Sequence, residues 1–393
     1  MTGAPSPADD ATGRWARATI DADAIEHNVR LLLRRSEPAE VWAVVKADGY
    51  GHGAALAADA ALRGGASGLC VALVSEGMHL RSVGVTAPVL LLSEQPPDQI
   101  DAVLRHRLIP AVYTPAFVRA LADRAVGRVG VHVNVDSGMQ RVGVRPAELA
   151  PLIEALRAAA PSVTVDAVYT HLACADEPDH PANAQQLGRF DAALAELDAA
   201  GISPARRHAA NSAAALAIPA ARLSFVRAGI AIYGISPGPG VDHLCGGLRP
   251  ALSLRARVSF VKRVVGGTSI SYGWRHRFDR DTTVATVPIG YADGVPRRLG
   301  TLGGDEAPRP GADVLVGGRR CRIVGVVTMD QFMVDVGDLP VRAGDEVVLI
   351  GAQGDARIRA EEWAQRLGTI GYEIVCGISG RVPRVAVTDV DPS

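Results

Sequence analysis

The sequence predicts an α/β protein that has an N-terminal (β/α)8 TIM-like barrel followed by a C-terminal, mainly antiparallel β domain. From about residue 17 to residue 240, short apolar runs alternate with alanine-rich segments of helical spacing, a pattern typical of parallel strands joined by helices. After a glycine- and proline-rich stretch at 234–240, β-rich segments alternate with Gly/Asp turns. We therefore expect a disordered lead-in over 1–13, the barrel over 14–240 and the β domain over 241–393, to which an N-terminal strand can contribute.

The candidate strands of the barrel half are short and apolar. They cover residues 41–45, 68–73, 88–92, 109–113, 130–135, 166–170, 207–210 and 223–226. Segments at 146–160 and 183–200 have the length and spacing of helices. Polar side chains follow four of the strands, and these are Lys46, His171, Asn211 and Arg227. Because the active site of such a barrel lies at the carboxyl ends of its strands, we expect these side chains to converge.

The C-terminal part of the chain reads as strands and turns. Its β-rich segments lie at 253–265, 283–289, 321–327, 332–336 and 346–350. Residues 359–367 are an exception, because their spacing predicts a short helix.

The composition excludes several classes of protein. Of the 393 residues, 48% are hydrophobic and 21% charged, and 41 basic side chains stand against 42 acidic ones. No broad affinity for nucleic acid or for an anionic membrane is therefore expected, and no apolar run approaches the roughly 20 residues of a membrane helix. The five cysteines are scattered and fit neither a disulfide framework nor a zinc site. This favours a cytoplasmic location and predicts no bound metal.

Residues 43–53, with the sequence AVVKADGYGHG, are the most informative stretch of the chain. They place Lys46 at the end of a buried-strand pattern and directly before a glycine-rich turn. Partial burial at the mouth of a sheet lowers the pKa of a lysine, and such a lysine can form a Schiff base with an aldehyde cofactor. The alternative is a lysine whose ammonium group simply extends into solvent from the strand end.

Together with the Lys46 motif, several other motifs resemble the alanine racemase family, and the resemblance covers residues 14–387. The barrel half has DSGMQR at 136–141, TH at 170–171, HAANS at 208–212 and RAGI at 227–230; the β half has SYG at 271–273, GYADG at 290–294, MDQ at 329–331 and GYE at 371–373. The resemblance implies interconversion of L- and D-alanine with pyridoxal 5′-phosphate as cofactor. It also implies a homodimer whose subunits share their active sites.

The resemblance also implies roles for individual residues. Racemisation needs two bases on opposite faces of the substrate, and these would be Lys46 and, from the partner subunit, Tyr272. Arg227, held by His208, would face the pyridine nitrogen of the cofactor and leave that nitrogen unprotonated, because a guanidinium stays charged. The other residues implied to bind the cofactor are Tyr50, His171, Asn211, Ser212, Gly229, Ile230 and Tyr372. Those implied to bind or enclose the substrate are Arg141, Met329 and Tyr291.

Four of these residues also have a purely structural interpretation. Ser212 fits a helix N-cap as well as a phosphate ligand, and His171 fits an ordinary core histidine. Arg227 could instead be a salt-bridged surface residue, and Tyr272 an aromatic side chain on the face of a sheet.

Asn134 departs from the family pattern. Many members carry a carbamylated lysine there, whose negative charge orients the arginine that matches Arg141. The amide of Asn134 can accept a hydrogen bond from Arg141 but supplies no charge. We hypothesise that an anion such as chloride fills the gap, or that Arg141 is held less firmly.

The predicted substrate entrance is less positive than usual, because Val326 stands where many members have an arginine, whereas Asp176 and Arg297 match the family. A broad-specificity or serine-preferring racemase is therefore an alternative. A fold-related decarboxylase is disfavoured by Arg227 and Tyr272. A cofactor carrier resembles only the barrel half, so the β domain argues against it. The sequence leaves open whether a D-amino acid product serves cell-wall synthesis or a specialised pathway.

Overall fold

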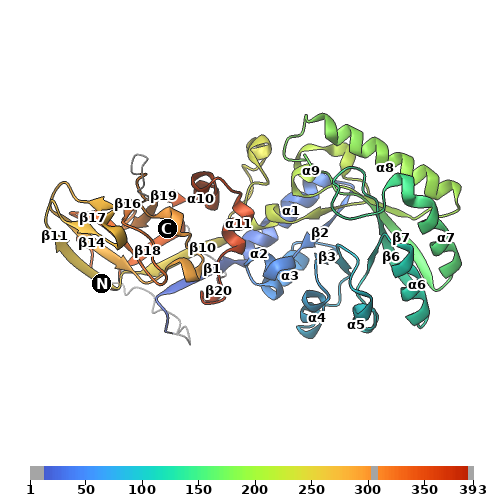
Figure 1. Ribbon diagram of the computed structural model, residues 1–393, viewed down its shortest axis with the longest axis horizontal. Coiled ribbons are helices and arrows are strands. Elements are labelled where there is room, and N and C mark those ends of the chain that lie inside the picture. The colour runs from blue at the N-terminus through green and yellow to red at the C-terminus, as the bar shows by residue number, and fades with distance from the viewer. Residues whose placement is uncertain (1–12, 302–308, 388–393) are drawn as a thin grey trace. The chain divides into compact units, whose positions relative to one another are not determined.

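The computed structural model describes residues 13–301 and 309–387 of the chain. These residues form two compact units, of which one is Ala22–Ala251 and the other joins the residues before Ala22 to those from Leu252 onward. The first unit is a (β/α)8 barrel and the second is a mainly antiparallel β domain (Figure 1), as the sequence predicts.

The expected lead-in lies outside the described residues, except for Gly13. The division into a barrel domain at 14–240 and a β domain at 241–393 stays a prediction. No described helix is both long and apolar enough to cross a lipid bilayer.

A barrel strand forms at each of the eight predicted positions. The strands are β2 (Glu40–Val44), β3 (Gly68–Val71), β4 (Val89–Leu91), β5 (Ala111–Val112), β6 (Val129–Asn134), β7 (Val163–Tyr169), β8 (Arg206–His208) and β9 (Phe225–Ala228). They form two parallel ladders in the orders β4-β3-β2-β9 and β5-β6-β7-β8. Between β4 and β5, the Leu91 N–H donates to the Ile109 carbonyl at 2.9 Å, and between β8 and β9 the Ser224 N–H donates to the Arg207 carbonyl at 2.9 Å. Hydrogen bonds outside the two ladders therefore close the ring where the ladders end.

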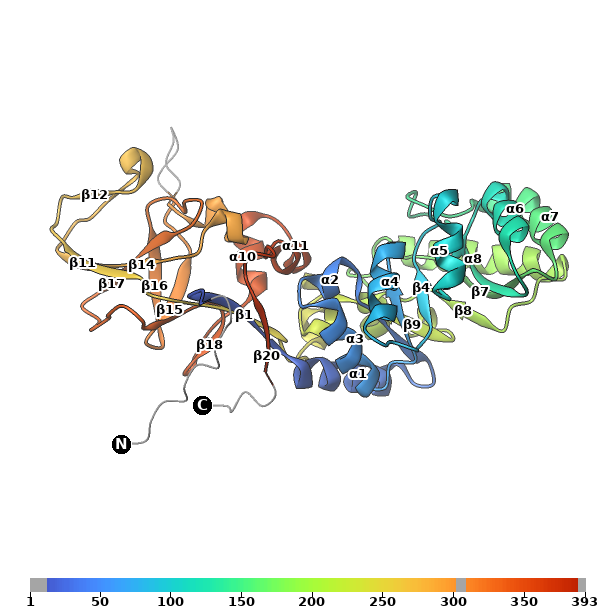
Figure 2. The same ribbon diagram turned by 90° about the horizontal axis from the view of Figure 1, so that it is seen from below.

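Helices surround these strands (Figures 1 and 2). The α-helices are α1 (Ala22–Ser36), α2 (Lys46–Tyr50), α3 (Ala54–Arg63), α4 (Val74–Ser82), α5 (Ile100–Arg105), α6 (Pro115–Arg124), α7 (Leu149–Ala159), α8 (Pro181–Ala199) and α9 (Ser212–Ala217). Short 3-10 helices join them, namely η1 (Pro97–Gln99), η2 (Pro146–Glu148), η3 (Pro219–Ala221), η4 (Ile230–Tyr233) and η5 (Pro239–Leu244).

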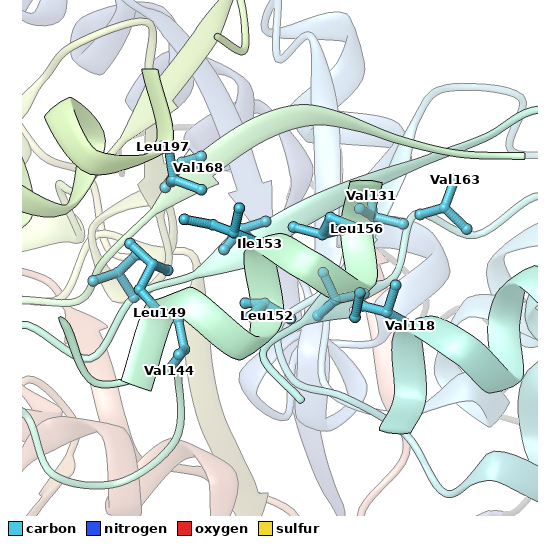
Figure 3. Packing of buried hydrophobic residues seen from close by; sticks show 14 of the residues in the cluster. Val118, Val131, Val144, Leu149, Leu152, Ile153, Leu156, Val163, Val168 and Leu197 are labelled. Atoms are coloured by element: carbon cyan, nitrogen blue, oxygen red, sulfur yellow. The ribbon is translucent and has the colours of Figure 1, made fainter. Parts of the chain in front are cut away.

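Helix α7 illustrates how the barrel buries its apolar residues. Leu149, Leu152, Ile153 and Leu156 recur at helical spacing and are buried. They belong to one cluster with valines of β6 and β7 (Figure 3). The apolar stripe of the helix therefore covers the outer face of these strands.

The β unit is built on a ten-stranded sheet. Its strands are β1 (Ala16–Asp21), β10 (Leu252–Arg257), β11 (Phe260–Val264), β14 (Thr282–Val287), β15 (Asp313–Val316), β16 (Arg319–Val324), β17 (Phe332–Gly337), β18 (Glu346–Gln353), β19 (Ala356–Ile358) and β20 (Arg384–Val387). The order is β11-β14-β17-β16-β15-β18-β10-β1-β20, with β19 beside β18. Strand β1 pairs antiparallel with β10 and parallel with β20, so it lies between two strands that follow the barrel in the sequence.

The remaining elements of this unit carry candidate site residues. A separate hairpin is formed by β12 (Ser269–Ile270) and β13 (His276–Arg277), with η6 (Tyr272–Trp274) at its tip. The other elements are η7 (Tyr291–Asp293), η8 (Arg297–Leu299), α10 (Ala360–Leu367) and α11 (Gly371–Cys376). Helix α10 confirms the short helix predicted at 359–367, whereas α11 is an addition to the predicted elements.

Candidate active site

Lys46 begins α2, which is a left-handed turn directly after β2. Ala47, Asp48 and Tyr50 have φ angles of 52°, 53° and 53°, a region that residues with a Cβ rarely adopt. Glu76 of α4 stabilises this turn, because its Oε1 accepts the Ala47 N–H at 2.6 Å. The turn predicted from the glycines is therefore confirmed, and a strained backbone fixes the position from which Lys46 extends.

Glu76 also links this turn to the next barrel loop. Its Oε2 accepts the backbone N–H groups of Ala72 and Leu73, at 2.8 and 3.0 Å. One carboxylate therefore holds the loops that follow β2 and β3 together. Sequence reasoning missed Glu76, although a glutamate early in a predicted helix is a known sign of reach-back to the preceding backbone.

Arg227 is a buried cation on β9, the strand that pairs with β2. The residue is 3% exposed. Its guanidinium donates to His208 Nδ1 at 2.6 Å and to the carbonyls of Thr170 and Ala209 at 2.8 and 3.1 Å. None of these partners is a carboxylate, and burial lowers the pKa of Arg227. The interpretation of Arg227 as a salt-bridged surface residue is therefore wrong.

The hydrogen bonds of Arg227 fix the protonation of three histidines. A guanidinium only donates, so His208 Nδ1 is an acceptor, and so is His171 Nδ1 at 3.3 Å from the same guanidinium. His208 must then carry its proton on Nε2, which lies 3.2 Å from His132 Nδ1. His132 in turn accepts that bond and carries its own proton on Nε2. All three imidazoles are thus neutral.

The pKa shifts of these histidines agree with neutral rings. Burial, followed by the charges of Arg206 and Arg227, lowers the pKa of His132 to about 3. Burial and then the charge of Arg227 lower the pKa of His208 well below its ordinary value. Burial also lowers the pKa of His171 to about 3, followed by the charges of Arg227, Arg141 and Lys46. Three cations therefore act on His171, so the structure brings Lys46, Arg141, His171 and Arg227 to one end of the barrel.

A polar cradle lies beside them. Ser212 Oγ accepts the N–H of Gly229 at 2.8 Å and a second N–H of the same loop, that of Ala231, at 3.3 Å. A Cβ on Gly229 would lie 2.6 Å from the Tyr50 hydroxyl, so the absence of a side chain there admits that hydroxyl. Asn211, not Ser212, caps α9, by accepting a backbone N–H of that helix at 3.0 Å. Ser212 Oγ accepts both N–H groups, so its own hydroxyl hydrogen remains a donor, and a hydroxyl donor suits an anion such as phosphate.

Asn134 and Arg141 flank the loop that follows β6. Asn134 is 4% exposed, whereas Arg141 is exposed. The loop between them is shaped by Asp136, whose Oδ1 accepts the N–H groups of Gly138 and Gln140, both at 3.0 Å. In the part of the chain that the structure describes, no hydrogen bond joins Asn134 to Arg141, so the amide does not orient the arginine directly.

Tyr272 extends from the tip of the β12–β13 hairpin and is 75% exposed. It lies in η6 rather than on the face of a sheet, so the structural interpretation given above for Tyr272 is wrong. Ser271, with φ 67°, fixes this tip, because its Oγ donates to the Val326 carbonyl and accepts the Val326 N–H, each at 3.2 Å. The candidate base and the candidate entrance residue are therefore neighbours within the β unit.

Tyr291 and Met329 lie on two loops that contact each other. The Tyr291 N–H donates to the Thr328 carbonyl at 3.0 Å, and the Ala292 N–H donates to the Met329 carbonyl at 3.0 Å. The side chains of Tyr291 and Met329 are exposed. A Cβ on Gly290 would lie 2.3 Å from the Thr328 oxygen, so the close approach of these loops requires glycine. Tyr372 is half-buried on α11, in the same unit.

His132 is the other site residue that sequence reasoning missed. It alternates with Asn134 in the predicted strand 130–135, and a period of two places both side chains on one face of the sheet. That signal could have paired His132 with the candidate site. Among residues 13–301 and 309–387, no cluster of histidine, cysteine or acidic residues is arranged to hold a metal ion.

Comparisons with known proteins agree with the two-unit architecture. Residues 20–237 match the alanine racemase N-terminal domain, and residues 251–386 match the alanine racemase C-terminal domain. The chain is 50% identical to an alanine racemase of Symbiobacterium thermophilum, over 94% of this chain and 96% of the relative. It is 45% identical to an alanine racemase of Thermobifida fusca, over 94% and 98%.

Solved structures give the same result. The alanine racemase of Bacillus anthracis with bound L-Ala-P superposes with a TM-score of 0.89 at 39% identity and covers 96% of both chains. The alanine racemase of Streptomyces coelicolor A3(2) superposes with a TM-score of 0.88 at 38% identity, over 97% of this chain and 100% of that one. The chain therefore belongs to the alanine racemase family and is an enzyme of that family.

Proposed function

We propose that this enzyme interconverts L- and D-alanine with pyridoxal 5′-phosphate, as a homodimer whose subunits share their active sites. One observation carries the proposal: Lys46 directly follows β2, the buried Arg227 lies on the neighbouring strand β9, and the cradle around Gly229 lies beside them. The names of its relatives support alanine as the substrate. A cytoplasmic location stays a prediction from the cysteine pattern.

The residues of the barrel fit this cofactor. A buried arginine without a carboxylate partner suits a ring nitrogen that accepts a hydrogen bond, and the neutral His171 can pack against an aromatic ring. Lys46 is proposed to bind the aldehyde carbon. When bound, the cofactor stabilises negative charge at the α-carbon of the amino acid. The residues proposed to hold its phosphate are Tyr50, Asn211, Ser212, Gly229, Ile230 and Tyr372.

Arg227 is proposed to direct the chemistry toward racemisation. Its guanidinium donates to the neutral His208 and His171. Because a guanidinium stays charged, Arg227 is proposed not to transfer a proton to the pyridine nitrogen. Without a proton on that nitrogen, negative charge spreads less from the α-carbon into the ring. Return of a proton to the α-carbon is then favoured over transamination.

Two bases move the α-proton. Lys46 is proposed to act on one face of the substrate and Tyr272 of the partner subunit on the other. An unperturbed tyrosine has a pKa of about 10, so positive charge from Arg141 is proposed to help the phenolate form. Arg141 and the Met329 N–H are proposed to bind the substrate carboxylate, and Tyr291 to narrow the entrance to a small side chain.

The proposal is tested by incubating the purified enzyme with pyridoxal 5′-phosphate and a panel of L-amino acids. Chiral chromatography then measures the D-enantiomers, and visible absorbance measures the bound cofactor. We expect rapid formation of D-alanine, loss of the visible band in Lys46→Ala, and loss of turnover with the band retained in Tyr272→Phe. Tyr113→Phe, which changes a half-buried tyrosine of the barrel, is the matched control.

Each other result has a definite meaning. A preference for serine would make serine the substrate and would indicate that the altered entrance at Val326 admits the larger side chain. A bound cofactor without racemisation of any amino acid would refute the proposed activity and favour a cofactor carrier.

A further inference from the structure

Asp293 is a buried carboxylate at the end of η7 in the β unit. The residue is 0% exposed. Its Oδ2 accepts the Gly290 N–H at 2.9 Å, and its Oδ1 lies 2.6 Å from a guanidinium nitrogen of Arg14 and 3.3 Å from Nε of Arg381. Because an unpaired buried charge is strongly destabilising, these two arginines are needed where they are. Residues from both ends of the chain thus converge on one carboxylate.

Arg381 binds a second carboxylate, and this one directly follows a candidate substrate residue. A terminal nitrogen of Arg381 donates to Asp330 Oδ1 at 2.8 Å. Asp330 comes next after Met329, whose side chain is 53% exposed, so packing does little to fix this loop. One planar guanidinium therefore lies between η7 and the Met329 loop, with Nε 3.3 Å from Asp293 Oδ1 as an ion pair and a terminal nitrogen hydrogen-bonded to Asp330.

The backbone makes the same connection. Tyr291 and Ala292 donate their N–H groups to the carbonyls of Thr328 and Met329, at 3.0 Å each. The loops of Tyr291 and Met329 are thus joined by main-chain bonds on one side and by the chain Asp293–Arg381–Asp330 on the other. Other arginine–carboxylate pairs of this unit, such as Arg263 with Asp338 at 3.5 Å, do not bridge two candidate site loops.

We propose that Asp293, Arg381 and Asp330 are positioning residues that set the Met329 N–H and the Tyr291 ring for the substrate. The inference rests on the proposed function, in which these two groups bind and enclose the amino acid. The guanidinium is essential to it, because its planar group pairs with Asp293 through one nitrogen while another donates to Asp330, whereas a lysine is a point charge on a flexible stem that cannot hold both carboxylates in a fixed arrangement. A purely structural role would instead change stability and leave substrate affinity alone.

The test compares Arg381→Lys and Asp330→Asn with the wild-type enzyme and with Asp338→Asn as the matched control. Steady-state kinetics gives KM and kcat for alanine, and the inhibition constant of propionate reports binding of the carboxylate alone. We expect KM and the propionate constant to rise roughly tenfold, with kcat changed less, because small displacements of a binding group lower affinity strongly. Asp338→Asn is expected to match the wild type. An unchanged KM in both test variants, or a loss of stability without a change in KM, would overturn the proposal.

Hydrogen exchange measured by mass spectrometry supplies a readout that needs no turnover. Peptides that cover 290–293 and 328–331 are expected to exchange faster in Arg381→Lys, and propionate is expected to protect 328–331 only in the wild type. If the wild type racemises nothing, the proposed function fails, and this protection then decides the positioning role by itself. Equal exchange and equal protection in the wild type and Arg381→Lys would refute it.

Discussion

Acidification should destabilise this protein through three buried histidines. His132, His171 and His208 are neutral in the folded state because each accepts a hydrogen bond at Nδ1. In the unfolded chain each takes up a proton with a pKa of about 6.5. Below that pH the unfolded state binds more protons than the folded state, so the free energy of unfolding falls as the pH is lowered.

The size of the effect follows from this linkage. Between pH 7.0 and 5.5, each histidine that stays neutral costs about 1.2 kcal/mol, so the three together cost about 4 kcal/mol. The loss continues down to the folded-state pKa, which is about 3 for His132 and for His171. It fades above pH 7, as the histidines of the unfolded chain also lose their protons.

His132→Phe isolates one contribution. The aromatic ring keeps most of the volume, but the Nε2–H of His208 loses its acceptor, which costs about 1–3 kcal/mol at pH 7. Over the same pH interval the variant should lose about 1.2 kcal/mol less than the wild type, because one titrating group is gone. Urea denaturation of the holoenzyme at pH 7.0 and 5.5, followed by circular dichroism, measures both quantities.

The control is His79→Gln, which removes an exposed histidine of α4. It should show the pH dependence of the wild type. Carboxylates titrate in all of these proteins, so their contribution cancels when the losses of unfolding free energy between pH 7.0 and 5.5 are subtracted. If His132→Phe loses as much free energy between pH 7.0 and 5.5 as the wild type, then His132 is not a neutral member of the buried chain and the reasoning fails.

Three further perturbations test the barrel end. Glu76→Gln keeps the shape of the side chain but leaves only one accepting oxygen, so it should lower the free energy of unfolding by about 1–3 kcal/mol. Glu154→Gln on the exposed face of α7 is the control. An unchanged free energy of unfolding in Glu76→Gln would show that the strained turn needs no carboxylate. Gly229→Ala places a Cβ 2.6 Å from a tyrosine hydroxyl and should weaken cofactor affinity at least about tenfold in an absorbance titration. Gly188→Ala has open space and should leave that affinity unchanged, and equal affinities in the two variants would contradict the cradle. Asn134→Lys should change turnover only modestly, with or without bicarbonate, and complete loss would count against a supporting role for this position.

Most strands of the barrel could be predicted because they are short apolar runs, and burial on both faces favours such a composition. Strand β8 is the exception, because its residues Arg206, Arg207 and His208 are polar and only His208 is buried. Lys46 was found for a related reason, since a single polar residue ends such a run. The two places where the ladder pairing is interrupted, between β4 and β5 and between β8 and β9, were not predictable. They depend on the distance between neighbouring strands, which the sequence of one strand does not show. Residues 253–265 read as one β-rich segment, yet they form β10 and β11, which pair with different partners.

The interactions around Arg227 show where sequence reasoning stops. The role of His132 depends on a partner 76 residues away, and its own strand shows only that it shares a face with Asn134. Glu76 and Asp293 likewise act through contacts between loops. A charged residue in a loop looks the same in sequence whether it faces solvent or holds another loop, so its function appears only once the chain is folded.

Strand β1 is synthesised before both of the strands with which it pairs, β10 and β20. Ala16 pairs with Ala256, and Ala18 pairs with Arg384, so both neighbours of the first strand are translated after the entire barrel. At about 5–20 residues per second, β1 waits roughly 10–50 s at the ribosome before β10 emerges. In topological terms the barrel is an insertion within the β unit. The barrel can fold as it is synthesised, whereas the sheet of the β unit, the unit that carries Tyr272 and Met329, can be completed only after β20 has been made.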